Sequence, residues 1–316
     1  MLFIGVFICV CVLGYLAQNT GLCMVRGIYE WKAGNKEFLF AILFSGTLAW
    51  VAAISSYVVN IPFHVKTYAM SGWFLFGGFV FGLGAAFNNG CGISTLNRLT
   101  RGDTKMIVTI MGWLIGWVIL ADYSPKRELM KHPLAGDINC LLLIVISLII
   151  VIWVSLGDKK RKRLWFGMMG IGLLSGFIYI YEPKWPPSGL LHQLSDALIN
   201  DNSSGWPSLE QYLLFFALLL GMFLSAWKAK IFKFIPLNIK HWVINLLAGI
   251  LMGLGASLAI GGNSVQLLLG LPSFSSAGFV AVAGMLLGIW IGISFKRYIK
   301  RIIFNSKNNF LKSLLI

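Results

Sequence analysis

The sequence predicts an all-α, polytopic integral membrane protein, and three observations support this fold class. The chain of 316 residues is 58% hydrophobic and 12% charged. Its mean hydropathy of +0.80 excludes an ordinary soluble globular domain. Apolar runs of membrane-spanning length recur along the whole chain, and they are too long and too uniformly apolar for the alternating strands of a membrane barrel.

We expect about nine transmembrane helices, because each span needs roughly twenty mostly apolar residues. In chain order they are Phe3–Leu22, Phe38–Val59, Gly72–Asn89, Met106–Ala121, Ile138–Leu156, Leu164–Tyr181, Tyr212–Trp227, Trp242–Ile260 and Phe279–Phe295. The first run lacks the basic segment of a cleaved signal before it, so we expect it to remain as a span. No loop is long enough for an extramembrane domain, so residues 1–316 form a single membrane domain.

The net charge of +15 indicates topology, because the Lys and Arg residues lie in short loops and in the C-terminal tail. The densest clusters are Asp158–Arg163, Lys228–Lys240 and Lys296–Lys312. Such clusters are typical of cytoplasmic loops, and we expect no nucleic-acid partner. The N-terminus and the loop Glu182–Leu209 should then lie outside. The segment Arg26–Lys36 and the tail of residues 298–316 should lie in the cytoplasm.

A glycine-rich segment occurs twice, each time after a long apolar run. The first copy is GLGAAFNNGCGISTLNRLTRGD at Gly82–Asp103, and the second is GLGASLAIGGNSVQLLLGLP at Gly253–Pro272. The topology places the copies toward opposite sides of the membrane, which requires them to be inverted. We therefore expect a pseudo-two-fold inverted repeat of residues 1–122 and 164–297, with residues 138–157 as the linking helix. Each break should introduce a re-entrant half-helix.

The two breaks predict a substrate site within the membrane. Gly90, Gly92, Gly261 and Gly262 remove side chains where the backbone must turn or approach another element. The amides that begin a half-helix carry partial positive charge and can hold an anion. Polar residues follow each break, and those after the second one are Asn263, Ser264 and Gln266. Helix packing would explain any single glycine, but the duplication favours a site.

Among the five cysteines, Cys91 is the main candidate for a functional thiol because it lies between glycines in NNGCG, near half-helix amides. Cys23, at the inner end of the first span, is equally open to a packing role. We expect Cys9, Cys11 and Cys140 to act as small hydrophobic residues.

The centres of the expected spans contain no Asp, Glu, Lys, Arg or His. Intramembrane carboxylates usually carry proton or cation coupling, so their absence argues against an ordinary proton or sodium antiporter. It also argues against a haem or metal site, which would need His or clustered Cys ligands. We expect no cofactor and no catalytic residue.

In these residues and motifs, the chain resembles the YeeE/YedE membrane family, a sulfur-transport family of bacterial inner membranes. The resemblance rests on GxGAxxxxGCGxxxLxRLxxGD at Gly82–Asp103, on GLCMxxG at Gly21–Gly27, and on GLGAxxxxGGN followed by LLxGLPS in the second half. It implies an hourglass of inverted repeats, with cysteines along a central path that takes thiosulfate inward. It also implies a bacterial inner-membrane location and, as a partner on the basic face, a soluble sulfur carrier resembling TusA.

Carried over to this sequence, the resemblance implies that Cys91 is the central thiol and Cys23 the thiol nearest the cytoplasm. The chain departs from the thiosulfate-type pattern in its second half, where an outer cysteine would be expected. Gly261, Gly262, Asn263 and Ser264 stand there instead. An amide and a hydroxyl can still donate hydrogen bonds to an oxyanion.

The leading functional prediction is uptake of a small sulfur-containing anion, with thiosulfate as the first candidate, by a lipid-embedded permease that is not an enzyme. Cys91 and Cys23 would act as successive hydrogen-bonding stations. One alternative is an intramembrane thiol or sulfur-transfer enzyme, which would need a resolving thiol near Cys91. Another is a structural membrane subunit that recruits a soluble sulfur carrier. The sequence leaves open the exact substrate, the energy coupling and the oligomeric state.

Overall fold

The computed structural model is built from α-helices, as the sequence predicts. It describes residues 2–61, 67–121, 123, 128–129, 136–200, 205–236 and 242–313, and within them no β-strand occurs beyond isolated bridges. Seven helical segments in these ranges are long and apolar enough to cross a membrane, or up to eight if a pair bent by 42° is one span. The fold class of a polytopic all-α membrane protein is therefore confirmed.

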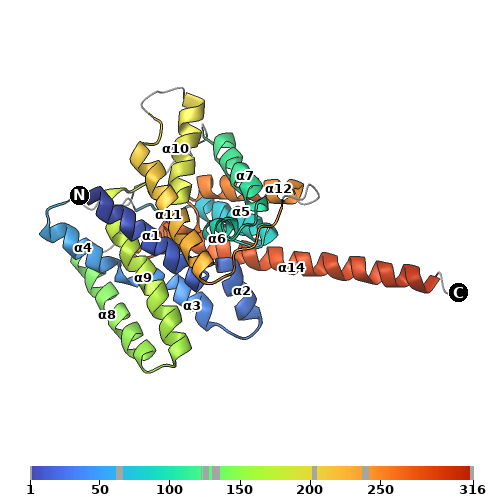
Figure 1. The fold of residues 1–316 in the computed structure, drawn as a ribbon, viewed down its shortest axis with the longest axis horizontal. Coiled ribbons are helices and arrows are strands. Elements are labelled where there is room, and N and C mark those ends of the chain that lie inside the picture. Colours follow the sequence, from blue (N-terminus) through green and yellow to red (C-terminus); the bar gives the residue numbers. More distant parts are fainter. Residues whose placement is uncertain are drawn as a thin grey trace.

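The longer helices are labelled in Figure 1. Their bounds are α1 (Leu2–Thr20), α2 (Met24–Lys32), α3 (Glu37–Leu43), the 3₁₀ turn η1 (Ser45–Leu48), α4 (Ala49–Val58), α5 (Gly72–Asn88), α6 (Gly92–Thr100), α7 (Lys105–Ile119), α8 (Gly136–Ser155), α9 (Lys159–Tyr181), α10 (Pro187–Asn200), α11 (Leu209–Lys228), α12 (Trp242–Leu258), α13 (Asn263–Val265), the π-helical turn η3 (Gln266–Gly270) and α14 (Ser276–Ser313).

Every expected span contains a helix, but three details differ from the prediction. The run Phe38–Val59 is interrupted by η1, and α7 is a short helix of 15 residues. The last span continues as one helix, α14, into the segment expected to be a tail.

The prediction that Glu182–Leu209 is only a loop is wrong, because α10 occupies Pro187–Asn200. Proline at the first helical position costs no hydrogen bond. The apolar residues Leu190, Leu191 and Leu194 then recur at helical spacing; Leu191 and Leu194 pack with the core, and Leu190 is buried. The segment Arg26–Lys36 likewise contains most of α2.

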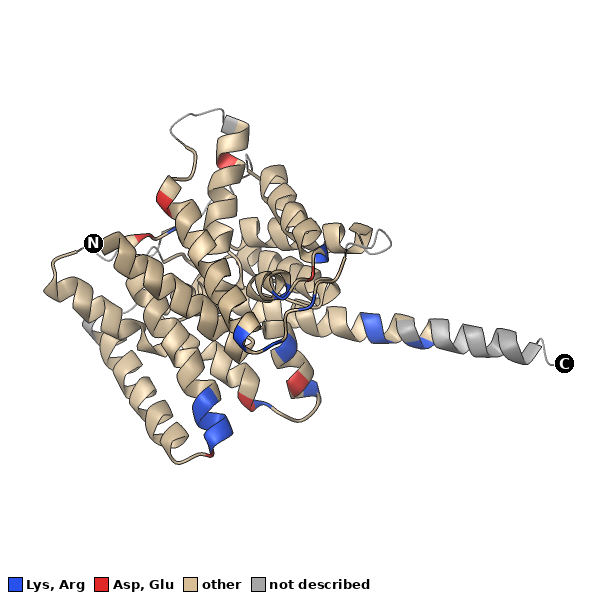
Figure 2. Cartoon of the chain, in the orientation of Figure 1, with Lys and Arg blue, Asp and Glu red and all other residues tan. Residues whose placement is uncertain are grey.

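Lys and Arg residues gather at one end of the helical bundle, which we call the basic end (Figure 2). Ion pairs and hydrogen bonds tie the helix ends together there. Arg161 at the start of α9 pairs with Glu37 at 2.8 Å, and Lys32 of α2 donates to Ser294 of α14 at 2.7 Å. The opposite end holds Tyr68, Tyr181 and the start of α10. Of the Lys and Arg residues that the structure describes, Lys184 lies at this opposite end.

Helices from the two halves of the chain pack on each other at the centre of the molecule. Helices α5 and α12 pack on each other, α14 packs along α5, and α7 packs along α12. Farther out, α1 packs on α11, while α9 packs on η1 and α4. Glycines allow this close approach: a Cβ atom on Gly253 of α12 would lie 2.7 Å from the Gly116 Cα atom of α7. The glycine-rich breaks that follow α5 and α12 therefore lie where the two halves of the chain meet.

Candidate functional site

The two glycine-rich breaks have the same backbone conformation. Cys91 caps the N-terminus of α6 with φ −79° and ψ −177°, and Gly262 caps α13 with φ −77° and ψ −173°. Each cap is preceded, two residues earlier, by a left-handed residue: Asn89 with φ 57° and Ile260 with φ 52°. The copies seen in the sequence are therefore copies in structure, and Cys91 corresponds to Gly262.

The first break brings the two candidate thiols together. Cys91 is completely buried and Cys23 is 7% exposed. The Cys23 thiol lies beside the Cys91 thiol and the Ser94 side chain. Cys23 also caps α2, so the first turns of α2 and α6, each a helix of nine residues, direct backbone N–H groups toward the thiol pair. The two candidate thiols are therefore direct neighbours.

The second break reaches the same place through Asn263. Its side-chain Nδ2 donates to the Cys91 sulfur at 3.4 Å, although the two residues lie 172 positions apart in the chain. Asn263 is 1% exposed. This hydrogen bond joins the two breaks directly and completes a cluster of two thiols and one amide.

Two aromatic rings close the wall beside this cluster. Phe81 of α5 and Trp113 of α7 meet edge to face with ring centroids 6.5 Å apart. A Cβ atom on Gly92 would lie 2.6 Å from the Trp113 ring, and one on Gly262 would lie 3.3 Å from the Phe81 ring. A side chain at Gly92 would therefore displace the Trp113 ring, and one at Gly262 would fit only tightly against the Phe81 ring.

The other predicted site residues shape the breaks rather than the cluster. Gly261 has φ +122°, a conformation that favours glycine. Gln266 donates to the Ala259 carbonyl at 2.6 Å and so bridges the second break. Gly90 packs on the Ser94 hydroxyl, and Ser264 is buried at 4% exposure.

Asn88 is a structural residue of the first break that sequence reasoning missed. Its side chain donates to the Gly90 carbonyl at 3.0 Å and to Thr95 at 2.7 Å, and it accepts from Thr109 at 3.1 Å. Arg98 then donates to the Asn88 carbonyl at 2.8 Å. The paired asparagines before GCG could have indicated this network, whereas Phe81 and Trp113 have no local signal.

Polar atoms without partners extend from the thiol pair toward the basic end. The Gln18 amide is 3% exposed, and neither its oxygen nor its nitrogen has a hydrogen-bond partner among the described residues. Asn97 donates to the Ala17 carbonyl at 3.2 Å, while its own oxygen stays unpaired within the same described part of the chain. Buried polar groups are normally paired, so these amides are suited to a polar cargo or water.

Arginines surround the basic end of the first break. Burial, together with the charges of Arg26 and Arg98, lowers the pKa of Arg101. The three guanidinium groups therefore lie near one another. Two of them are paired with carboxylates, Arg26 with Glu30 at 2.7 Å and Arg98 with Asp103 at 2.8 Å.

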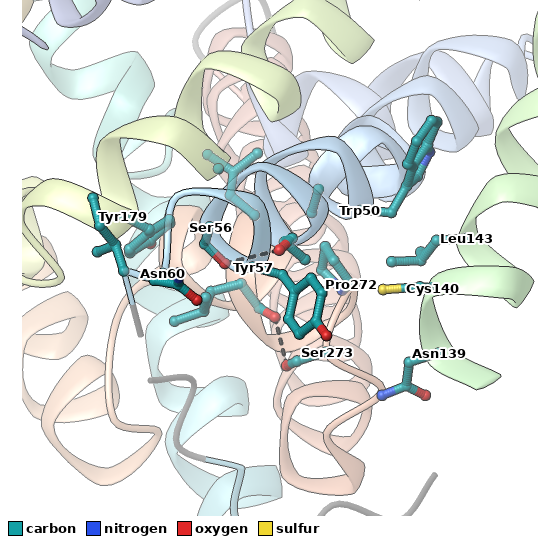
Figure 3. Close-up of a pocket in the computed structure, with 16 residues that line it drawn as sticks. Trp50, Ser56, Tyr57, Asn60, Asn139, Cys140, Leu143, Tyr179, Pro272 and Ser273 are labelled. Carbon is teal, nitrogen blue, oxygen red and sulfur yellow. Dashed lines mark hydrogen bonds between the residues drawn. The ribbon is translucent and has the colours of Figure 1, made fainter. Parts of the chain in front are cut away.

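An apolar cavity lies away from this cluster. It has a volume of about 480 Å³ and is bounded by α4, α8, α9 and the segment after η3 (Figure 3). Cys140 of α8 lines it beside Leu143 and Asn139, so this thiol is separate from Cys23 and Cys91. The described residues include no group of three or more His, Cys, Asp or Glu that could hold a metal ion.

Comparison with known proteins bears directly on this arrangement. The sequence profile of a family described as sulphur transport matches residues 21–185 and 152–291. The chain is also 22% identical over 333 residues to the thiosulfate transporter TsuA of Escherichia coli (strain K12). That alignment covers 90% of this chain and 91% of the relative.

Proposed function

We propose thiosulfate as the cargo of this chain, which belongs to the sulphur transport (YeeE/YedE) family and transports a small sulfur-containing anion. The relative TsuA is named a thiosulfate transporter and aligns with this chain along nearly its whole length. A transporter of this ion must present hydrogen-bond donors within the membrane without an opposing carboxylate.

The single observation that carries the proposal is the hydrogen bond from Asn263 to Cys91, with Cys23 beside it. It places two thiols and an amide at the contact between the two breaks. Thiols and amides donate hydrogen bonds without bringing a negative charge. The helix N-termini of α2 and α6 add partial positive charge. An anion that replaced the Asn263–Cys91 hydrogen bond would meet the two thiols, the Asn263 amide and the N-termini of α2 and α6.

We propose a central path that runs through this cluster. From the end opposite the basic end, the anion passes Gly261, Gly262 and Ser264 to reach Asn263 and Cys91. It then passes to Cys23, between Gly90 and Gly92 of the first break, and leaves past the arginines of the basic end. Gln266 stabilises the second break beside this path through its hydrogen bond to the Ala259 carbonyl.

An inverted repeat explains this meeting of breaks. Residues 1–122 and 164–297 would be the repeats, and residues 138–157 the linking helix. Helix α7 of the first repeat packs on α12 of the second, and α14 of the second repeat packs on α5 of the first. This reciprocal packing supports the assignment, as does the matching backbone conformation of Cys91 and Gly262. In such a repeat, a site on the pseudo-two-fold axis faces both sides in turn.

The contact between Cys23 and Cys91 also provides the second thiol that an intramembrane sulfur-transfer enzyme would need beside Cys91. The family and the relative are nevertheless transporters and not enzymes. We therefore assign the Cys23–Cys91 pair to binding. Trapping a disulfide or persulfide on Cys91 during turnover would contradict this assignment.

We propose that the basic end faces the cytoplasm of a bacterial inner membrane, with the N-terminus outside and residues 298–316 inside. The gathering of Lys and Arg at that end supports this orientation (Figure 2). A TusA-like soluble carrier could then receive the sulfur there. A fluorescent protein fused to the C-terminus should fold and fluoresce. A reporter that is active only when secreted should be inactive at the same position, and its activity there would contradict the orientation.

The test of function is uptake by the purified protein in lipid vesicles. We expect accumulation of ³⁵S-thiosulfate that excess unlabelled thiosulfate abolishes and excess sulfate barely reduces. Equal inhibition by sulfate would contradict thiosulfate as the specific cargo. Vesicles that passed no sulfur anion would instead favour the structural-subunit alternative.

A further inference from the structure

Helix α8 leaves open space between itself and the rest of the protein. Among the candidate spans that the structure describes, its buried share is the smallest: 17% of its most apolar stretch is buried, against 33% or more in each of the others. The Trp50 indole N–H of α4 donates to the Ser147 hydroxyl of α8 at 3.1 Å and so holds the two helices together. The space beside α8 is therefore a feature of the packed protein.

Three cavities follow one another along α8, and together we call them the α8 groove. The first is the cavity of Figure 3, which Asn139 and Leu143 line. The second has a volume of about 360 Å³, and Leu143 and Ile146 line it together with Phe279 of α14. The third, of about 640 Å³, extends from Ile146 to Trp153. Because Leu143 borders the first two cavities and Ile146 the last two, the groove follows one face of α8 toward the basic end.

The α8 groove has the depth of one membrane leaflet. Asn139 and Ile150, which line its first and third cavities, lie roughly 16 Å apart along the helix axis, since each helical residue adds about 1.5 Å. One leaflet contributes half of a hydrocarbon core that is about 30 Å thick. Tyr57 borders the first cavity and is 84% exposed, as is typical of tyrosines at a membrane–water interface. An acyl chain that enters beside Tyr57 therefore fits the groove along its length.

The first cavity contains two polar atoms that the protein leaves unsatisfied. The Tyr179 side chain of α9 is 3% exposed, and its hydroxyl has no hydrogen-bond partner among the described residues. The Asn139 Oδ1 atom is buried as well and lacks a partner in that same part of the chain. Such exceptions call for an explanation, because each unsatisfied buried polar group costs stability. The Tyr179 hydroxyl can donate to an occupant, and the Asn139 oxygen needs a donor from it.

The remaining lining residues decide the charge of the occupant. The described residues that line the first and second cavities include no Asp, Glu, Lys, Arg or His. A ligand with a net charge would be unpaired there, and burying an unpaired charge costs much free energy. This excludes a free inorganic anion. The occupant must combine a long apolar body with a polar end that has no net charge and carries both acceptors and donors.

We propose that the first and second cavities bind a phospholipid with a zwitterionic headgroup that carries N–H donors, of the phosphatidylethanolamine type. Its headgroup accepts from the Tyr179 hydroxyl and donates to the Asn139 oxygen, while one acyl chain runs along the α8 groove past Leu143 and Ile146. Leu269 of η3 lines the first cavity too, so the lipid contacts both α8 and the second glycine-rich segment. The inference is independent of which anion the protein transports.

The test is photolabelling of the purified protein in lipid vesicles. The probe is a phosphatidylethanolamine with a diazirine on its acyl chain, and mass spectrometry locates the label. We expect label on α8 and on the facing part of α14. Unlabelled phosphatidylethanolamine should compete far better than phosphatidylcholine, which has no N–H donor, and better than the anionic phosphatidylglycerol. Equal competition by all three lipids, or label confined to other helices, would overturn the proposed site.

Two variants examine the polar end and the groove separately. Tyr179→Phe removes one hydrogen bond and should lower the labelling of α8 about fivefold, whereas Leu143→Trp fills the groove and should abolish it. Their matched controls are Tyr212→Phe, at a tyrosine that is 39% exposed, and Leu141→Trp, at a leucine of α8 that is 61% exposed; both should label normally. Because the Tyr179 hydroxyl has no partner among the described residues, Tyr179→Phe should fold normally, and unchanged labelling of this variant contradicts the proposal.

Discussion

Replacement of Cys91 by alanine is expected to lower the rate of thiosulfate uptake by about a hundredfold, because two charge-assisted hydrogen bonds to the anion are lost. One is the donor of Cys91 itself. The other comes from Asn263, whose amide is held in place by the Cys91 sulfur at 3.4 Å. The measurement is initial uptake of ³⁵S-thiosulfate into vesicles containing equal amounts of protein.

Two variants separate the function of the thiol from its packing. Cys91→Ser keeps a donor of similar size, so it should retain a measurable part of the rate. Cys9→Ala removes a thiol that is only partly buried on α1, and it should transport at the normal rate. Normal uptake by Cys91→Ala would show that the ion does not use this thiol.

The second large effect is expected from Asn263→Leu, which should reduce uptake by a factor of about one hundred while the protein still folds. Leucine has the same branched arrangement of side-chain heavy atoms as asparagine, so most packing contacts of this buried side chain, which is 1% exposed, are kept. What is lost is the donor that joins the two breaks, and an apolar group takes its place on the path. Uptake kinetics and gel-filtration profiles of the same samples measure both properties.

Asn245→Leu is the matched control for Asn263→Leu. Asn245 is also a buried amide that precedes the second break, at 9% exposure near the start of α12, but it lies outside the thiol cluster. It should leave the KM for thiosulfate unchanged. Equal losses for Asn245→Leu and Asn263→Leu would assign the effect to general packing of α12 and α13.

The spans could be predicted from sequence because hydropathy is a local property. The runs that became α1, α9 and α12 are continuous and apolar, and each forms a helix close to the expected bounds. α10 was missed for the same reason: it is amphipathic, and Pro186, Pro187 and Ser188 at its start resemble a loop.

The candidate site was predictable in its parts but not in its assembly. The repeated glycine segment indicated Cys91 and Asn263 separately, because each follows a break that is visible in the sequence. Their hydrogen bond, and the approach of Cys23 to Cys91, are contacts between distant segments that α5, α7 and α12 bring about. Trp113 depends even more on packing, since nothing around it in α7 distinguishes it from a lipid-facing residue.

The most direct test of the central path is the position of a bound cargo analogue. Crystals of the protein soaked in selenosulfate, which carries selenium in place of the terminal sulfur of thiosulfate, would show the ion by anomalous diffraction. We predict a selenium peak in contact with the Cys91 sulfur and the Asn263 amide, and no such peak in Cys91→Ala. A peak confined to another part of the protein, such as the cavity beside Cys140, would contradict the path.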